Sequence, residues 1–148
     1  MENIALYAIS AALNGQKVFC KFLAANDTGL TGGHQEGIYI AKPAIPILFE
    51  TPGERGQNKD RWVEIKWQGD FTRRSRFIYY GQGSRNEYRI TNFGKGFPFL
   101  RPEYTGALFV LVMDSEEYYQ GFVLNTEDDI NQFLDAFGVS PTETNRLI

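Results

Sequence analysis

Hydrophobic and polar residues alternate along several short segments of the chain, which is the period of a β-strand. The clearest segments are Arg61–Gln68 and Arg85–Thr91, in which successive side chains should point to opposite faces of a sheet. Further strands are expected at residues 17–25, 36–41, 73–80 and 118–124. The unbroken apolar run Ala107–Met113 indicates one strand that is buried on both faces.

Two segments near the ends of the chain have the period of a helix. Residues 126–137 are the clearer one, because Thr126 can cap the first turn, acidic residues follow it and Gly138 ends it. Residues 3–14 predict a shorter amphipathic helix. Its apolar set would be Ile4, Leu6, Ile9 and Leu13. Between the predicted strands, residues 43–49 have room for one or two helical turns after a proline.

Together these elements indicate a mainly β protein with short flanking helices, an α+β fold with about seven or eight strands in a barrel or sandwich. The 148 residues, 43% of them apolar, are enough for one domain over residues 1–148 with a real core. No apolar run reaches the ~18 residues that a membrane span needs. Residues 50–60 are expected to be a polar loop, and the final residues, PTETNRLI, suggest a linker to a larger protein.

The distribution of charge is uneven, although the net charge is only −3. From Arg55 to Arg101 there are eleven Lys/Arg and four Asp/Glu, a net charge of +7. From Pro102 to Ile148 there is one Arg and nine Asp/Glu, a net charge of −8. This asymmetry predicts one basic and one acidic face, as in a nucleic-acid binder, and random clustering on a solvated surface is the alternative.

The single cysteine and the single histidine narrow the possible chemistry. Cys20 has no partner for an internal disulfide and is expected to be a small buried hydrophobe in a reducing compartment. Zinc sites of the usual spacings are excluded. The chain also lacks the G-x-S-x-G motif of a nucleophile elbow and the G-x-x-x-x-G-K-[ST] motif of a phosphate-binding loop.

One catalytic candidate remains, the triplet Glu64-Ile65-Lys66 on a predicted strand. Many magnesium-dependent nucleases use a D/E-x-K triplet, but such a site needs a second carboxylate to hold the cation. Asp60 is too near in sequence, and Asp27 is the only earlier acid of interest. Glu64 and Lys66 also share one polar strand face, as a simple cross-strand charge pair would.

The strand Arg85–Thr91 has a face that could read base pairs. Arg85, Glu87 and Arg89 share that face, with Asn86, Tyr88 and Ile90 on the other. Arginine binds O6 and N7 of guanine in a fork and glutamate accepts from N4 of cytosine, so this face suits adjacent G·C pairs in the major groove. A pure phosphate binder has no use for Glu87, because a carboxylate repels the DNA backbone. The alternative is a self-neutralising ladder of surface charges.

A second polar stretch, ANDTGLTGGHQ from Ala25, can project beside that strand. Asparagine and glutamine fit the edge of adenine, the threonine methyl group fits that of thymine, and glycines allow close approach of the backbone. The candidate base-reading residues here are Asn26, Thr31, His34 and Gln35. The alternative for His34 is a buried histidine that fastens the loop to the barrel.

Two blocks of this sequence resemble the N-terminal effector domain of EcoRII-type restriction endonucleases. They are ANDTG-TGGHQ-G-YI, from Ala25 to Ile40, and RNE-RIT--G-G-P, from Arg85 to Pro98, followed by TGAL from Thr105 to Leu108. The resemblance spans about residues 17–110, and the last 40 residues bring no matching motif. The chain departs from the family pattern at Gly83 and Tyr88, where the family has lysines.

The resemblance implies a DNA-binding pseudobarrel that grips the major groove from two sides. Its two projections would be an N-arm, residues 25–35, and a C-arm, residues 82–95. The implied target is 5′-CCWGG, where W is A or T, and the domain would bind this site as an effector without cutting it. Cutting would belong to a separate nuclease domain of the same parent chain, the only part to need magnesium.

The resemblance also implies which residues contact DNA. The family positions that match are His34, Tyr39, Arg85, Glu87 and Arg89. With the residues above, the expected base-binding set is Asn26, Thr31, His34, Gln35, Arg85, Glu87 and Arg89. The expected set for the DNA backbone or for support of the arms is Lys21, Thr28, Tyr39, Arg73, Arg74, Arg76, Asn86 and Lys95. Of these, Lys21, Arg73, Arg74, Arg76 and Lys95 are expected to hold phosphates.

We therefore expect a bacterial cytoplasmic domain that binds double-stranded DNA as a monomer, with no catalytic residue, no metal and no cofactor of its own. Two alternatives stay open from the sequence. One is a small magnesium-dependent nuclease that uses Glu64 and Lys66. The other is a regulatory DNA binder outside restriction, such as a repressor.

Overall fold

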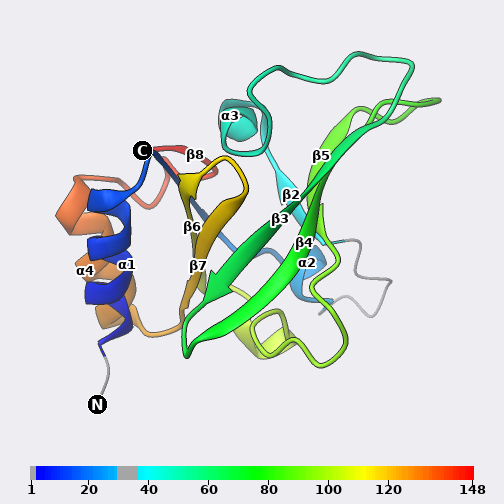
Figure 1. The fold of residues 1–148 in the computed structure, drawn as a ribbon. Helices are drawn as coiled ribbons and strands as arrows, with labels where there is room; N and C mark the ends of the chain where they lie inside the picture. The colour runs from blue at the N-terminus through cyan, green and yellow to red at the C-terminus, as the bar shows by residue number, and fades with distance from the viewer. Residues whose placement is uncertain (1–2, 30–36) are drawn as a thin grey trace.

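One curled sheet of eight strands dominates the part of the chain that the structure, a computed structural model, describes, which is residues 3–29 and 37–148 (Figure 1). The strand order is β2-β5-β4-β3-β7-β6-β1-β8. Neighbouring strands are antiparallel, except for the parallel pair of β3 and β7. The strands are β1 Lys17–Phe22, β2 Ile38–Ile40, β3 Lys59–Trp67, β4 Phe71–Tyr80, β5 Glu87–Thr91, β6 Leu108–Ser115, β7 Tyr118–Leu124 and β8 Arg146–Leu147. This mainly β architecture confirms the expected fold class.

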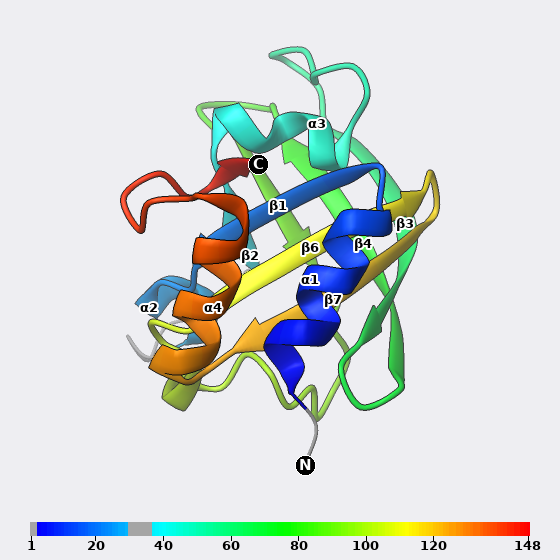
Figure 2. The same cartoon turned by 90° about the vertical axis from the view of Figure 1, so that its left-hand side faces the viewer.

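Short helices flank the sheet. The two longer ones, α1 and α4, lie side by side against the outer face of β1, β6 and β7 (Figure 2). Their bounds and those of the short helices are α1 Ile4–Asn14, α2 Ala25–Thr28, the 3₁₀ turn η1 Lys42–Ala44, α3 Ile45–Leu48, the 3₁₀ turn η2 Pro102–Tyr104 and α4 Glu127–Phe137. Within the described residues, no helix is both long and apolar enough to cross a membrane.

The sheet separates two hydrophobic cores, and β6 contributes to both. Phe109 and Leu111 point into the curl of the sheet, where the larger core lies. Leu108, Val110 and Val112 point the other way, into a second core under α1 and α4. The prediction that the run of apolar residues at 107–113 is buried on both faces is therefore confirmed.

The helix α4 begins and ends as its sequence predicts. The Thr126 hydroxyl accepts a hydrogen bond from the backbone N–H of Asp129 at 3.2 Å, which satisfies one free donor of the first turn. Gly138 ends the helix in the left-handed conformation, with φ of 62°.

The buried face of α1 is not the one that its sequence pattern predicts. Leu6 and Leu13 are 54% and 71% exposed, whereas the helix buries its alanines. The buried set is Ala5, Ala8, Ala11 and Ala12, with Ile4 and Ile9 partly buried beside the second core. The small methyl groups let α1 lie close to the sheet, and the chain continues this close approach at Gly15, where a Cβ would lie 2.3 Å from Val112 Cγ1.

The last residues of the chain belong to the fold, which corrects the expectation of a linker at PTETNRLI. Arg146 and Leu147 form β8, paired with β1. The backbone N–H of Asn145 donates to the carbonyl oxygen of Cys20 at 2.7 Å, and that of Ile148 donates to Val18 at 3.0 Å. A two-residue strand at the edge of a sheet is hard to find by sequence pattern.

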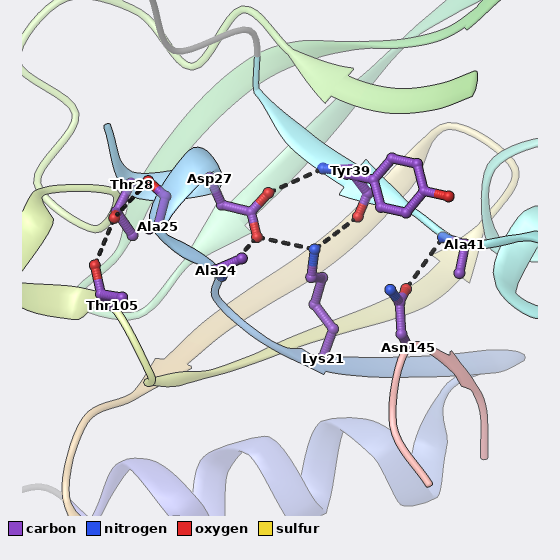
Figure 3. Close-up of polar contacts among 9 residues, drawn as sticks. All are labelled: Lys21, Ala24, Ala25, Asp27, Thr28, Tyr39, Ala41, Thr105 and Asn145. Carbon is purple, nitrogen blue, oxygen red and sulfur yellow. Dashed lines mark hydrogen bonds and ion pairs between the residues drawn. The ribbon is translucent and has the colours of Figure 1, made fainter. Parts of the chain in front are cut away.

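Side chains connect the two ends of the sheet. The strand order leaves β2 and β8 as edges, yet both come close to the same side of the barrel. Lys21 of β1 donates to the carbonyl oxygen of Tyr39 in β2 at 2.9 Å, and the Asn145 side chain accepts from the N–H of Ala41 at 3.2 Å (Figure 3). Polar side chains therefore close the barrel where strand pairing stops.

The thiol of Cys20 should make the stability of the domain fall in mildly alkaline solution. Cys20 is fully buried, and burial raises the pKa of its thiol from 9.0 to about 12. Between these values the unfolded chain releases a proton that the native chain keeps, so the free energy of unfolding decreases as the pH rises. Urea unfolding at pH 7 to 10 should show this decrease, and Cys20→Ala should flatten it. An equal slope in both proteins would contradict the assignment to Cys20.

Candidate nucleic-acid interface

Three of the seven residues predicted to read bases lie together at β5, with side chains on its outer face. Glu87 and Arg89 alternate with buried Tyr88 and Ile90 along β5, and Arg85 lies just before the strand. Tyr88 and Ile90 point into the core inside the curl, so Glu87 and Arg89 are on the outer face of the sheet, and β5 is separated in the strand order from β7, β6 and β1, whose outer face α1 and α4 cover. The structure therefore confirms the predicted face for Glu87 and Arg89, while the strand begins at Glu87 and not at Arg85 as predicted.

The carboxylate of Glu87 is held between the two arginines. Arg85 donates from Nε to Oε1 at 2.9 Å, and Arg89 donates from Nη2 to Oε2 at 3.1 Å. Burial acts to raise the pKa of Glu87, but the hydrogen bond from Arg85 and the charges of Arg89 and Arg85 outweigh it and hold this pKa below its ordinary value. Arg85, Glu87 and Arg89 therefore form a ladder of ionised side chains. This geometry fits base reading and also fits the alternative, a self-neutralising ladder of surface charges.

Two tyrosine rings support the arginines of this ladder. The guanidinium carbon of Arg85 lies 3.8 Å from the centroid of the Tyr80 ring, and that of Arg89 lies 5.9 Å from the centroid of Tyr39. Tyr39 is directly opposite Arg89 in the register of β2 and β5. Cation–π contacts of this kind restrict the guanidinium planes, so the donors are oriented before any ligand arrives.

The root of the C-arm is tied to the loop of residues 50–58. The backbone N–H of Gly81 donates to the Asn58 side chain at 3.0 Å, and its carbonyl oxygen accepts from Gly56 at 2.7 Å. The hydroxyl of Tyr88 accepts from the N–H of Gly53 at 2.8 Å. Sequence reasoning gave this polar loop no role, because it has no periodicity. The structure assigns it to support of the C-arm.

Two further C-arm positions also point inward and act as supports. Asn86 accepts a hydrogen bond from the hydroxyl of Tyr79 at 2.7 Å. Tyr88, where the resemblance led us to expect a lysine, is 6% exposed and packs on Tyr79 with ring centroids 4.6 Å apart. A tyrosine here stiffens the base of the C-arm instead of adding a cation to its surface.

A buried ion pair fixes the root of the N-arm (Figure 3). Lys21 Nζ lies 2.8 Å from Asp27 Oδ2, and the two side chains are only 6% and 1% exposed. The same carboxylate accepts from the N–H of Ala24 at 2.8 Å and from the N–H of Tyr39 at 3.1 Å. Asp27 therefore joins the two ends of the N-arm, and sequence reasoning missed this role.

The burial of Lys21 corrects its expected contact with a phosphate. Its ammonium group is enclosed by Asp27 and the carbonyl oxygen of Tyr39, so it does not reach the surface. Its position agrees with the other expected role, support of an arm. Sequence alone could not show this, because the partner of the lysine lies on a short helix after the strand.

Thr28 also supports the N-arm from inside. Its hydroxyl lies 2.6 Å from that of Thr105 and donates to the carbonyl oxygen of Ala25 at 3.3 Å (Figure 3). Asn26 is exposed on α2. The other three expected base readers of this arm, Thr31, His34 and Gln35, lie outside the residues that the structure describes.

The expected phosphate contacts of β4 divide between the two faces of the strand. Arg74 and Arg76 are on the outer face, where Arg76 Nε lies 2.7 Å from Asp60 Oδ2 and Arg74 lies over the ring of Trp62. Arg73 is on the other face, and its Nε donates to the carbonyl oxygen of Phe93 at 3.1 Å. Arg73 therefore fixes the segment after β5, which is a supporting role. Lys95 in that segment is exposed.

The residues of the nuclease alternative already have other partners or lie apart from a second acid. Glu64 is exposed on β3 opposite Arg74, and Lys66 pairs with Asp70 at 3.3 Å. Asp27 is already engaged with Lys21. In the described ranges, no three His, Cys, Asp or Glu side chains come together to hold a metal ion.

Comparisons with known proteins agree with the fold and the chain order of these elements. The sequence profile of the family described as "Restriction endonuclease EcoRII, N-terminal" matches residues 12–143. Type II restriction enzyme EcoRII from Escherichia coli is 32% identical in an alignment 118 residues long that covers 75% of this chain and 29% of that enzyme. The chain thus spans less than a third of the length of this relative.

A solved structure has a similar fold. It is the B3 domain of the UbaLAI restriction endonuclease, crystallised with cognate DNA. The two folds superimpose with a TM-score of 0.61 over 99% of this chain and 98% of that one, at 18% sequence identity. The half-closed, curled sheet described above is therefore a pseudobarrel of the B3 type.

Proposed function

The chain belongs to the family of N-terminal domains of EcoRII-type restriction endonucleases, and on that premise we propose that it binds double-stranded DNA in a sequence-specific way. The observation that carries the proposal is the ladder of Arg85, Glu87 and Arg89 on an outer strand face. A carboxylate between two arginines is suited to base edges and not to phosphates alone.

In the proposed complex, the C-arm enters the major groove with this ladder. Arg85 and Arg89 bind guanines through O6 and N7, and Glu87 accepts from N4 of a cytosine. The aromatic supports and the tie to residues 50–58 hold the ladder in place, so little side-chain entropy is lost when DNA binds. Arg74, Arg76 and Lys95 provide contacts to phosphates, which set the position of the domain on the duplex.

The N-arm supplies the other half of the proposed contact. Asn26, Thr31, His34 and Gln35 read the remaining bases, including the A/T centre of 5′-CCWGG. A single chain on a nearly palindromic site must use different groups on the two halves, and the two arms of this chain differ in sequence. The buried pair of Lys21 and Asp27 holds the root of this arm beside β2, and so beside β5.

The proposed role in the parent protein is that of an effector or targeting module. The domain would bind a copy of the recognition site as a monomer, without cutting it. A nuclease domain elsewhere in the same chain would cut DNA with magnesium. The family match supports this role.

Competition binding tests the proposed function directly. The purified chain should bind a duplex with CCAGG or CCTGG at least about 10³-fold more tightly than a scrambled duplex of the same length, and both affinities should fall with salt. Supercoiled plasmid incubated with the chain and magnesium should stay uncut. Equal affinity for the two duplexes would refute specific binding, and cleavage that is lost in Glu64→Ala would favour the nuclease.

A further inference from the structure

A hollow of about 690 Å³ lies beside the proposed base-reading strand. One wall is the root of the N-arm at Thr28 and Gly37, and the outer-face residues Arg76 and Tyr80 of β4 also line it. The opposite wall is formed by residues 91–102, the segment that follows β5. The hollow therefore lies between the two arms. The lining residues among those that the structure describes carry no carboxylate, and the carboxylate of Asp60 pairs with Arg76 at 2.7 Å.

The backbone of the opposite wall has an unusual conformation at residues 92–96. Asn92, Gly94 and Gly96 have positive φ angles of 64°, 86° and 77°, whereas Phe93 and Lys95 between them do not. Backbones that alternate in this way can turn successive N–H groups towards one concave side, where they bind anions. Among the described residues, none accepts a hydrogen bond from the backbone N–H groups of residues 93–96.

Positive side chains surround this segment. Arg76 and Arg101 line the hollow, and Lys95 is exposed on the segment itself. Arg73 packs against the inner side of residues 92–96. Its Nε donates to the carbonyl oxygen of Phe93 at 3.1 Å, and a Cβ built at Gly94 would lie 3.0 Å from that nitrogen. The guanidinium of Arg73 is held in turn on the ring of Phe71, 4.1 Å from its centroid. Glycine at position 94 thus leaves room for the guanidinium of Arg73 next to the backbone amides of this segment.

We propose that residues 92–96, together with Arg76 and Arg101, bind a phosphate group. The amide donors would bind its oxygens, and the arginines would balance its charge. This inference rests on the proposed function for its natural ligand, a phosphodiester of the DNA backbone next to the bases that the ladder reads. Register places the site beside the ladder, since Arg76 is opposite Thr91 and Arg89 is two residues along the same strand.

Titration with inorganic phosphate tests the site without DNA. In ¹H–¹⁵N spectra, the amide signals of Gly94 and Gly96 should shift and saturate with phosphate, and should not do so with chloride at the same ionic strength. Arg101→Gln should weaken this response severalfold. Arg146→Gln removes an exposed arginine of β8 that does not line the hollow, so this variant should leave the phosphate response unchanged. Amides that do not respond to phosphate would overturn the proposal, whatever the chain does with DNA.

Binding to duplexes separates the two sources of phosphate. If the ligand is the DNA backbone, Arg101→Gln should make the slope of log affinity against log salt about 0.9 less steep. It should also lower the affinities for cognate and scrambled duplexes by similar factors. Arg146→Gln should keep the slope. If phosphate shifts the amides but DNA of either sequence does not, the assignment to DNA is overturned and the site takes free phosphate. If the unmodified chain bound cognate and scrambled duplexes equally tightly while Arg101→Gln still lowered the salt slope, base reading would be refuted and this site would be supported.

Discussion

Glu87→Gln should reduce the sequence discrimination of the domain, weakening its binding to a CCWGG duplex by about 1–3 kcal/mol. Glutamine has nearly the same shape, but it replaces one acceptor oxygen with a donor and loses the charge that holds Arg85 and Arg89. Binding to random duplexes should stay the same or become tighter, because a carboxylate that faces the phosphates is gone. Competition binding with cognate and scrambled duplexes at one salt concentration measures both changes.

The matched control for this variant is Glu64→Gln. Glu64 is exposed on the neighbouring part of the outer face, opposite Arg74, so its replacement removes the same charge outside the ladder. It should leave the ratio of the two affinities unchanged. If Glu87→Gln changed the affinities for cognate and scrambled duplexes by the same factor, Glu87 would act only through the electrostatic potential of the surface. Base reading by this strand would then be wrong.

Lys21→Met should lower the free energy of unfolding by about 3–5 kcal/mol, since it leaves the buried carboxylate of Asp27 without its cation. The methionine fills a similar volume, so the loss reports mainly the uncompensated charge. Urea unfolding followed by circular dichroism measures the effect. The control is Lys66→Met, which breaks the exposed pair with Asp70 and should cost at most about 1 kcal/mol.

A double-mutant cycle distinguishes the ion pair from general packing. Asp27→Asn alone should also be strongly destabilising, because the aspartate accepts from Ala24, Tyr39 and Lys21 together. The combination with Lys21→Met should cost clearly less than the sum of the two, since no buried charge remains. Additive losses would show that the two side chains act independently, and the described coupling of the N-arm root would not hold.

The period of a strand explains why the central part of the site was predictable. Side chains alternate strictly between the two faces of a sheet, so Glu87 and Arg89 had to share a face once the segment was interpreted as a strand. Arg85 precedes the strand and is held beside them by its hydrogen bond to Glu87. The cap and the terminating glycine located α4 in the same way. In these cases the local sequence contains the whole structural cause.

Other features depend on contacts between distant segments, and for this reason they escaped the sequence pattern. The apolar side chains of α1 suggested one buried face, but close approach to the sheet selects the alanine face instead. Lys21 reads as a surface cation until the position of Asp27 is known. The loop of residues 50–58 shows its role only through its hydrogen bonds to Gly81 and Tyr88.

The order of the strands also determines when the domain can be completed during synthesis. The strand β1 leaves the ribosome well before both of its neighbours, since β6 begins at residue 108 and β8 at residue 146. Until they emerge, the apolar segment KVFCKF has no strand partner, so the nascent chain exposes a segment that chaperones can bind. Such long-range pairing also slows folding. A stalled or truncated product that ends before residue 108 would leave β1 unpaired, and we expect it to aggregate.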